Sequence, residues 1–431
     1  MTFDFSALAL AGDASVRSLT KSYNDFGQTL FSHLAERPGN IVYSPYSAGV
    51  GFAMAMSGAR GATLAEFLEA MELTGQPSDI EAANGKLAEL FASYAAQRLE
   101  PEEVREAGRQ FGGRREQNLD NRGATADVGQ PITELASANL LALVSTDARQ
   151  RVAPEYRALL RTHYGAEIFE NANRAAIDAW AAERTRGNIK RVATWDKDAP
   201  PEFVLINAVH FYGRWAHPFE QDATTPLPFT TAAGKRADVP TMRREAILNH
   251  LDGDGFKSVW LPYLMTNALG MAIVLPDPGV SPNAVASRLA AEGLPALAQR
   301  LQGTRSTKVE VRLPRFAARL DASLKAPAQT AGLRLPFELG RANFGRVTGR
   351  SDEDRLFVGD VLQQASLEVT EAGTMASAAS IQFRYFYGIF RDDPIPFHVD
   401  RPFLFYVLDR NSGAILFQGR VDDPSAGIPL I

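Results

Sequence analysis

The residue types that most often carry enzyme chemistry are sparse in this sequence and stand in no catalytic pattern. The chain has no cysteine, which removes a thiolate nucleophile, a thiolate zinc site, an iron–sulfur cluster and any disulfide. Histidines could bind zinc or act as general bases, but their spacing contains no HExxH motif and no close pair on a helical face. The six histidines are His33, His163, His210, His217, His250 and His398.

Motifs for nucleotide binding and serine hydrolysis are also missing. The sequence contains no GxSxG, no Walker loop and no GxGxxG. The DGDG stretch at 252–255 has two carboxylates but lacks the rest of a calcium loop, so it is interpreted as a turn. We therefore expect a protein that is not an enzyme and needs neither a metal nor a cofactor.

Composition restricts the partners further. The 431 residues are 45% hydrophobic and 22% charged, which is typical of a globular protein with a large core. A net charge of −5 gives little general attraction to nucleic acid, and the arginines at 98–122 are diluted by glutamates, so that stretch is interpreted as a solvated surface. No apolar stretch reaches 18 residues, so no membrane span is expected.

The N-terminal residues MTFDFSALALAGDAS lack a positively charged start, and their apolar run is short. No secretory signal is evident from this pattern. The compartment stays open between the cytoplasm and secretion after processing.

The elements that must position any site change in type along the chain. The first third is helical by pattern: residues 44–61 predict a buried helix, and Thr63 with Glu66 matches a capping box. The second half is rich in β-branched and aromatic runs, which predict strands. Residues 404–408 predict a strand buried on both faces, and 411–413 predict a hairpin turn after it. Helices early and strands late indicate an α+β fold with a large, mostly antiparallel sheet.

One segment near the C-terminus is unusual. Residues 371–380 read EAGTMASAAS, and with a period of two one face carries Thr374, Ala376, Ala378 and Ser380, all small. No proline occurs from 371 to 393, so every N–H there could join a ladder. Alanine and serine are poor strand formers, so the segment would serve equally well as a loop. Competence for both states is what a conformational switch requires.

Six motifs in the right order give the chain a resemblance to the serpin family. The EAGTMASAAS segment resembles the family's hinge, and the chain is identified as a member, interpreted as a prokaryotic inhibitory one. The other motifs that carry the resemblance are NIVYSPYSAGVGFAMAMSGARGATLAEF, FVLINAVHFYGRWAHPFEQDAT, VPTM with VWLPY, LGMAIVLP with VRLPRF, and DRPFLFYVLDRNSGAILFQGRVDDP.

The resemblance implies one domain over residues 1–431, with three β-sheets, eight or nine helices and an exposed reactive-centre loop at about 372–397. It implies a monomeric suicide-substrate inhibitor, whose partner is a target serine protease held as a covalent acyl complex. The cleaved loop inserts into the main sheet as a new strand and traps the acyl-enzyme. The alternatives are a non-inhibitory serpin acting as a binding or chaperone-like protein, and an inhibitor of a trypsin-like or cysteine protease.

The resemblance also assigns residues to this mechanism. The hinge maps to Glu371, Gly373, Thr374, Ala376, Ala378 and Ser380. Its small residues favour an inhibitor, because they can enter a sheet without burying a charge. The sheet-opening region maps to Ser44, Ser47, Asn207, Trp215 and Gln363. Many members have a histidine where this chain has Gln363, and an amide cannot titrate, so pH-dependent opening through that position is not expected.

The scissile bond is placed by counting sixteen residues on from Glu371. This count gives Tyr387 before the bond and Gly388 after it, which suits a chymotrypsin-like or subtilisin-like protease. The loop is about four residues longer than the family pattern, so other bonds stay open. The alternative positions are Arg384, Phe386, Phe390 and Arg391, the arginines suiting trypsin-like enzymes.

Overall fold

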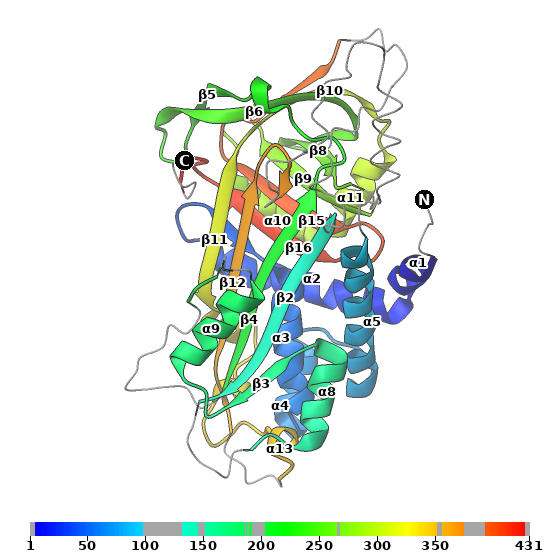
Figure 1. Cartoon of the computed structure of the whole chain (residues 1–431), viewed down its shortest axis with the longest axis vertical. Helices are drawn as coiled ribbons and strands as arrows, with labels where there is room; N and C mark the ends of the chain where they lie inside the picture. Colours follow the sequence, from blue (N-terminus) through cyan, green and yellow to red (C-terminus); the bar gives the residue numbers. More distant parts are fainter. Residues whose placement is uncertain are drawn as a thin grey trace, which may run out of the picture.

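Three β-sheets form the framework of the molecule, and α-helices pack around them (Figure 1). The computed structural model describes residues 5–97, 132–144, 151–185, 187, 189–191, 203–264, 268–350, 356–374 and 393–426. The α+β class and the three sheets are confirmed. The described residues form eleven α-helices rather than eight or nine, and two of these, α12 (Lys325–Thr330) and α13 (Gly345–Thr348), have only six and four residues.

Two of the sheets have six strands. The one at the centre of the molecule, which contains β12 and β4, is called the large sheet below. Its short strand β13 touches only one end of its neighbours, and beyond that end β12 and β4 pair directly and in parallel, from Val358 opposite Phe203 to Ser366 opposite His210. The strand order is β11 (Phe316–Ser323), β12 (Val358–Val369), β13 (Gly373–Thr374), β4 (Phe203–Arg214), β2 (Thr133–Leu143) and β3 (Glu167–Glu170).

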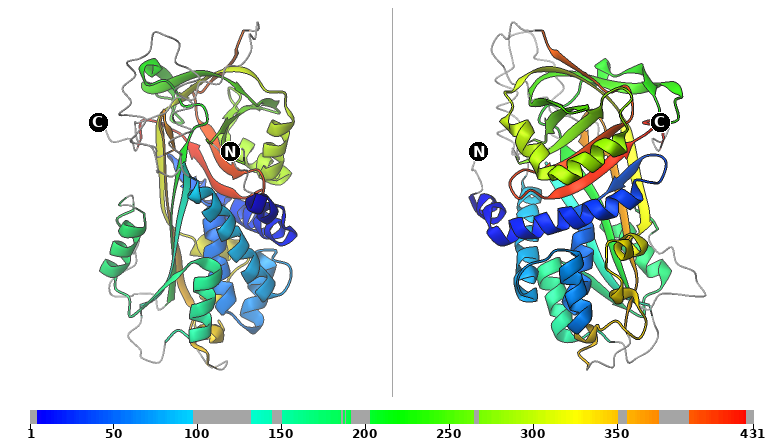
Figure 2. Two further views of the ribbon diagram at one scale, coloured as in Figure 1. Left: turned by 45° about the vertical axis from the view of Figure 1, so that its right-hand side comes forward. Right: turned by 180° about the vertical axis from the view of Figure 1, so that it is seen from behind.

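Side chains of β4 alternate between two covered faces of this sheet. Val204 and Ile206 pack with Ile177 of α9 (Arg174–Arg184), which lies alone on one side in Figure 2. Leu205 and Val209 belong to the main core on the opposite side, where α3 (Pro45–Gly58) lies. The period of two therefore directs the intervening polar residue, Asn207, toward α3.

Helix α3 is the central helix beneath the large sheet. All fourteen of its residues are buried, which confirms the helix predicted from its apolar sequence. Ser44 caps its N-terminus by accepting a hydrogen bond from the backbone N–H of Ser47 at 3.2 Å. A Cβ on Gly49 would lie 2.3 Å from the ring of Tyr23, so only glycine permits this approach to α2 (Ala14–Leu34). The other helices are α1 (Phe5–Gly12), α4 (Gly61–Ala70), α5 (Pro77–Ala96), α8 (Pro154–Tyr164), α10 (Pro282–Glu292) and α11 (Leu294–Gly303).

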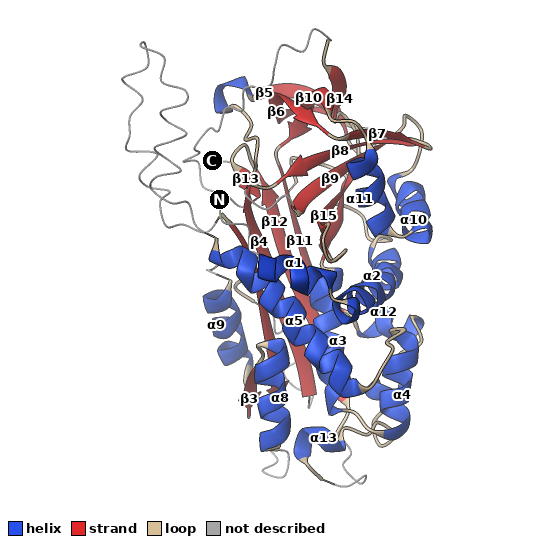
Figure 3. Cartoon of the chain, turned by 90° about the vertical axis from the view of Figure 1, so that its right-hand side faces the viewer, coloured by secondary structure: helices blue, strands red, loops and turns tan. Residues whose placement is uncertain are grey.

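Two further sheets complete the fold, as Figure 3 shows. The predicted hairpin is confirmed, because β15 and β16 pair antiparallel across residues 411–413, and every residue of β15 is buried. The second sheet is β1 (Ile41–Tyr43), β16 (Ile415–Val421), β15 (Phe403–Asp409), β9 (Leu269–Pro276), β8 (Phe256–Pro262) and β7 (His250–Gly253). The third is β14 (Ile395–His398), β10 (Thr307–Pro314), β6 (Arg236–Leu248) and β5 (Thr225–Thr230).

The predicted capping box at the start of α4 is wrong. The N-cap is Arg60, three residues before Thr63, and the helix begins at Gly61. The Thr63 hydroxyl instead accepts the N–H of Asn343 at 2.9 Å, and the Glu66 carboxylate accepts the N–H of Leu335 at 2.7 Å. Both polar side chains serve backbone donors from a distant segment, and this outweighs the local pattern.

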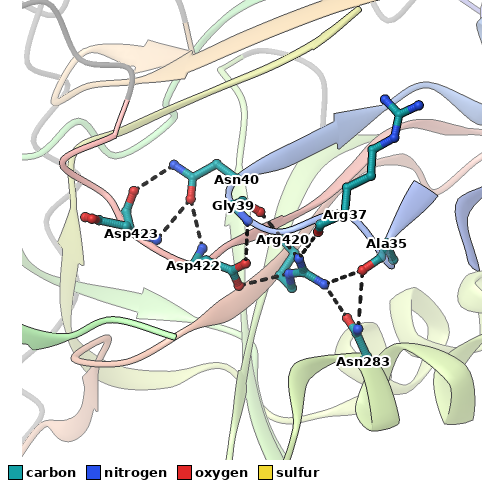
Figure 4. Close-up of polar contacts among 8 residues, drawn as sticks. All are labelled: Ala35, Arg37, Gly39, Asn40, Asn283, Arg420, Asp422 and Asp423. Carbon is teal, nitrogen blue, oxygen red and sulfur yellow. Dashed lines mark hydrogen bonds and ion pairs between the residues drawn. The ribbon is translucent and has the colours of Figure 1, made fainter. Parts of the chain in front are cut away.

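A buried arginine on β16 ties the second sheet to the helices beside it (Figure 4). The Arg420 guanidinium donates from Nη1 to the carbonyl of Ala35 and to Oδ1 of Asn283, both at 2.7 Å. It also donates from Nη2 to the carbonyl of Arg37 at 2.7 Å, and Nε lies 2.9 Å from the Asp422 carboxylate. Only 8% of the Arg420 side chain is exposed, so its charge depends on these partners rather than on water.

Replacing this arginine should destabilise the fold. Arg420→Met removes the counter-charge of the Asp422 carboxylate and a donor to two carbonyls, so we expect a loss of about 3 kcal/mol in the free energy of unfolding, measured by urea denaturation. Arg341→Met is the matched control, because that side chain is 72% exposed. It should cost about 0.5 kcal/mol or less. Equal losses in the two variants would contradict the role given to Arg420.

Candidate functional site

The chain reverses direction at the end of β12 and enters the large sheet. The reversal is a turn from Thr370 to Gly373, closed by the N–H of Thr370 donating to the carbonyl of Gly373 at 2.9 Å. Gly373 and Thr374 then form β13, with Gly373 opposite Arg214 and Thr374 opposite Gly213 of β4. Thr374 also pairs with Val369 of β12. Two residues of the sequence-predicted hinge therefore lie between the ends of β12 and β4.

Gly373 is required at this entry by its backbone and by its neighbours. Its φ of +155° is one that side chains with a Cβ rarely adopt. A Cβ added there would lie 2.0 Å from the carbonyl oxygen of Gly213, so the two backbones could not approach as they do. Gly373, predicted as part of the hinge, therefore permits the close approach of β13 to β4.

Glu371 anchors the turn from the side. The residue is 4% exposed, and its carboxylate accepts hydrogen bonds from Nε of Arg315 at 2.7 Å and from the hydroxyl of Thr224 at 2.6 Å. Its backbone carbonyl accepts the N–H of Phe219 at 2.9 Å. The buried charge is paired and hydrogen-bonded, as a buried carboxylate must be.

An aromatic pair lies beside β13, where the chain enters the large sheet. The Trp215 indole donates to the carbonyl of Thr370 at 3.1 Å, and its backbone N–H donates to the carbonyl of Ala372 at 3.1 Å. Its ring stacks on Tyr263, with centroids 4.7 Å apart and planes 8° apart. The Tyr263 hydroxyl lies 2.7 Å from the Thr374 hydroxyl, and burial raises the pKa of Tyr263, so its hydroxyl keeps its proton.

A second polar cluster joins the large sheet to α3 further down. The Gln363 amide accepts the backbone N–H of Ser44 at 3.1 Å and donates to the carbonyl of the same residue at 3.0 Å. The Ser47 hydroxyl donates to Oδ1 of Asn207, whose Nδ2 donates to Asn139 at 2.6 Å. Gln363 and Asn207 are register partners on β12 and β4. The cluster therefore spans the parallel pair at its centre.

The structure places the predicted sheet-opening residues in two groups. Trp215 lies beside β13, and the other four form the polar cluster beneath the centre of the β12–β4 pair. Sequence reasoning missed Tyr263, Arg315 and Asn139. Tyr263 and Arg315 lie within the VWLPY and VRLPRF motifs, which are their only sequence signal. The remaining predicted residues lie outside the described residues: Ala376, Ala378, Ser380, Arg384, Phe386, Tyr387, Gly388, Phe390 and Arg391.

Membrane and metal features were sought in the part of the chain that the structure describes. None of its helices combines the length and apolar character needed to cross a bilayer. Within the same residues, no group of three or more histidine, aspartate or glutamate side chains could hold a metal ion.

Comparison with known proteins defines the class. The family described as "Serpin (serine protease inhibitor)" matches residues 21–424, so the chain belongs to the serpin family. Iripin-2 of Ixodes ricinus is 29% identical, over 97% of this chain and 96% of that protein. Iripin-3 of the same organism is 30% identical, over 98% and 99%. The solved structure of Tengpin, a thermophilic serpin in the native state, shares the fold with a TM-score of 0.77 at 22% identity, over 95% of each chain.

The polar cluster generates a prediction about pH. A histidine in place of Gln363 can accept the backbone N–H of Ser44 only when it is neutral, and burial would hold its pKa below the unfolded value of about 6.5. Stability should then be lost as the pH falls below about 6.5, by about 1.4 kcal/mol per pH unit until the folded pKa is reached.

Thermal denaturation of Gln363→His between pH 5 and pH 8 measures this loss. Gln363→Met is the control, because it removes the same hydrogen bonds without adding a titrating group and should be equally destabilised at every pH relative to the natural chain. A Gln363→His variant with the pH profile of the control would contradict the position of this side chain against Ser44.

Proposed function

We propose that this protein is a suicide-substrate inhibitor of serine proteases. One observation carries the proposal: β13 lies between the ends of two parallel strands and is antiparallel to both of them. A strand continuing from Thr374 would run between β12 and β4 and form hydrogen bonds with each. The residues that follow are small on one face and contain no proline, so they suit such a strand.

The chemistry belongs to the target enzyme. The protease serine attacks the carbonyl of Tyr387, the peptide bond to Gly388 breaks, and the new amine of Gly388 leaves with a proton. The carbonyl is then held as an ester of the protease serine. Insertion of the freed segment into the large sheet would move this ester away from the loop's original position before water hydrolyses it. The protein itself supplies the bait and the sheet, and it needs no catalytic residue.

The choice of target follows from the residue before the scissile bond. Tyrosine at 387 fits the pocket of a chymotrypsin-like or subtilisin-like enzyme, and the arginines at 384 and 391 are the positions that a trypsin-like enzyme would cut. The small residues of the hinge support an inhibitor over a non-inhibitory binding protein, because a charge or a proline would oppose insertion.

Incubation with chymotrypsin, subtilisin, elastase and trypsin tests the proposal. We expect a covalent complex that survives SDS with chymotrypsin or subtilisin, and a released C-terminal peptide whose mass places its first residue at Gly388. A peptide beginning after Arg384 or Arg391 would move the target to the trypsin-like class. Clean cleavage by all four enzymes without complex would contradict inhibition and support the binding-protein alternative.

Substitution in the hinge should convert the inhibitor into a substrate. Thr374 is fully buried between two strands, and Thr374→Arg would bring a guanidinium into that space. Insertion then becomes slower than hydrolysis of the ester, so the ratio of cleaved protein to complex should rise at least tenfold. Thr374→Ser keeps the hydroxyl that faces Tyr263 and is the matched control. Undiminished complex formation by Thr374→Arg would contradict the assignment of this residue to the hinge.

A further inference from the structure

Strand β14 is attached to the third sheet by one short ladder. It lies at the outer edge of that sheet, beside β10, as Figure 3 shows. Among the described strands it pairs with β10 alone, in parallel, from Ile395 opposite Val309 to His398 opposite Arg312. Parallel pairs are slightly less stable than antiparallel ones, and Pro396 has no N–H to donate. The side chains on the two faces of β14 therefore matter for holding it in place.

His250 of β7 packs against the inner face of β14. Its ring lies edge to face with that of Phe397, with centroids 6.1 Å apart and planes 80° apart. Phe397 is 1% exposed, and 7% of the His250 side chain is exposed. Nε2 of His250 is buried and has no hydrogen-bond partner, since the Asp252 carboxylate is 3.8 Å away. Burial lowers the pKa of His250, an effect that Asp252 opposes and Lys257 reinforces.

A second histidine, His398, lies on β14 itself and projects from the opposite face. Its Nε2 is also buried without a hydrogen-bond partner, 3.6 Å from the Glu310 carboxylate. That carboxylate already accepts hydrogen bonds from Arg312 at 2.7 Å and from Arg243 at 3.0 Å. Burial and the charge of Arg312 lower the pKa of His398, against the opposing effects of Glu310 and Asp400.

Acid should weaken the attachment of β14 through both rings. While the strand is attached, each imidazole holds a proton less tightly than it would in water, where the pKa is about 6.5. Release of the strand would return both rings to water. Protons therefore favour the released strand, so the attachment is strongest above about pH 6.5 and weakens progressively as the pH falls below that value.

We propose that His250 and His398 together form a pH-sensitive latch, which releases β14 from the third sheet in mildly acidic solution. A charge on His250 would be buried between two sheets, and a charge on His398 would lie beside Arg312. The proposed reactive-centre loop ends in β14, so its C-terminal end would lose its support. This consequence rests on the proposed function, whereas the release of the strand does not.

The consequence for inhibition is measured by comparing the natural chain with the double variant His250→Phe, His398→Gln, which cannot titrate at either position. The rate of complex formation with subtilisin, variant over natural chain, should rise between pH 7.5 and pH 5.5, because a loop held at both ends presents its scissile bond in fewer conformations. The pH dependence of the protease itself cancels in this ratio. A constant ratio would contradict the consequence for the loop, and no complex at either pH would contradict the proposed function.

Hydrogen–deuterium exchange on the natural chain tests the release itself and needs no protease. After correction for the intrinsic pH dependence of exchange, the protection of the amides of residues 395–399 should fall about fivefold or more between pH 7.5 and pH 5.5. The β15–β16 hairpin is the internal reference, and its protection should stay the same. Equal protection of residues 395–399 at the two pH values, or an equal loss in the hairpin, would overturn the proposal.

The same exchange measurement on variants assigns the effect to the two histidines. His250→Phe keeps an aromatic ring against Phe397, and His398→Gln keeps a polar side chain beside Glu310. In the double variant, the protection of residues 395–399 at pH 5.5 should stay within about twofold of that at pH 7.5. The control is His33→Gln, in the last turn of α2, which should respond to pH as the natural chain does. A double variant with the natural pH response would overturn the proposal.

Discussion

The parallel pairing of β12 with β4 is the constraint on which the rest of this structure depends. These two strands meet at the centre of the large sheet, buried between α9 on one side and α3 on the other. Parallel pairs are slightly less stable per residue than antiparallel ones. A strand that continued from β13 would replace this one parallel ladder with two antiparallel ladders. The proposed insertion would therefore lower the free energy of the sheet.

The contacts beneath that pair determine how it can separate. A single amide, that of Gln363, satisfies both the N–H and the carbonyl of Ser44, which also caps α3. Asn207, its neighbour across the ladder, holds the Ser47 hydroxyl. The strands therefore cannot part without breaking polar contacts to the same helix end. Buried hydrogen bonds are costly to leave unmade, so these few contacts resist opening more than their number suggests.

Sequence and structure agree best where the signal is repeated along the chain. The buried helix at 45–58, the β15–β16 hairpin and the polar residues beneath the sheet follow from apolar runs, turn residues and family motifs. The contacts of Tyr263 with Thr374 and of Arg315 with Glu371 join residues 111 and 56 positions apart, and no local pattern specifies such pairs. Thr63 and Glu66 match a capping-box pattern, but their side chains accept hydrogen bonds from the distant backbone N–H groups of Asn343 and Leu335 instead. Arg420 shows the same limit, since composition places arginines on the surface and only the fold buries this one.

The register of β13 against β4 fixes where each later residue of the reactive-centre loop would lie if the strand continued. With Thr374 opposite Gly213, each further residue would pass one residue of β4, and residue 384 would come opposite Phe203, the first residue of that strand. At about 3.3 Å per residue, the twelve-residue strand measures about 40 Å. Phe203 is fully buried, so a guanidinium beside it would have to extend past the end of the strand to reach water. In such an inserted strand, residue 387 would lie past the end of β4, so anything bound to it would be carried along the full length of that strand.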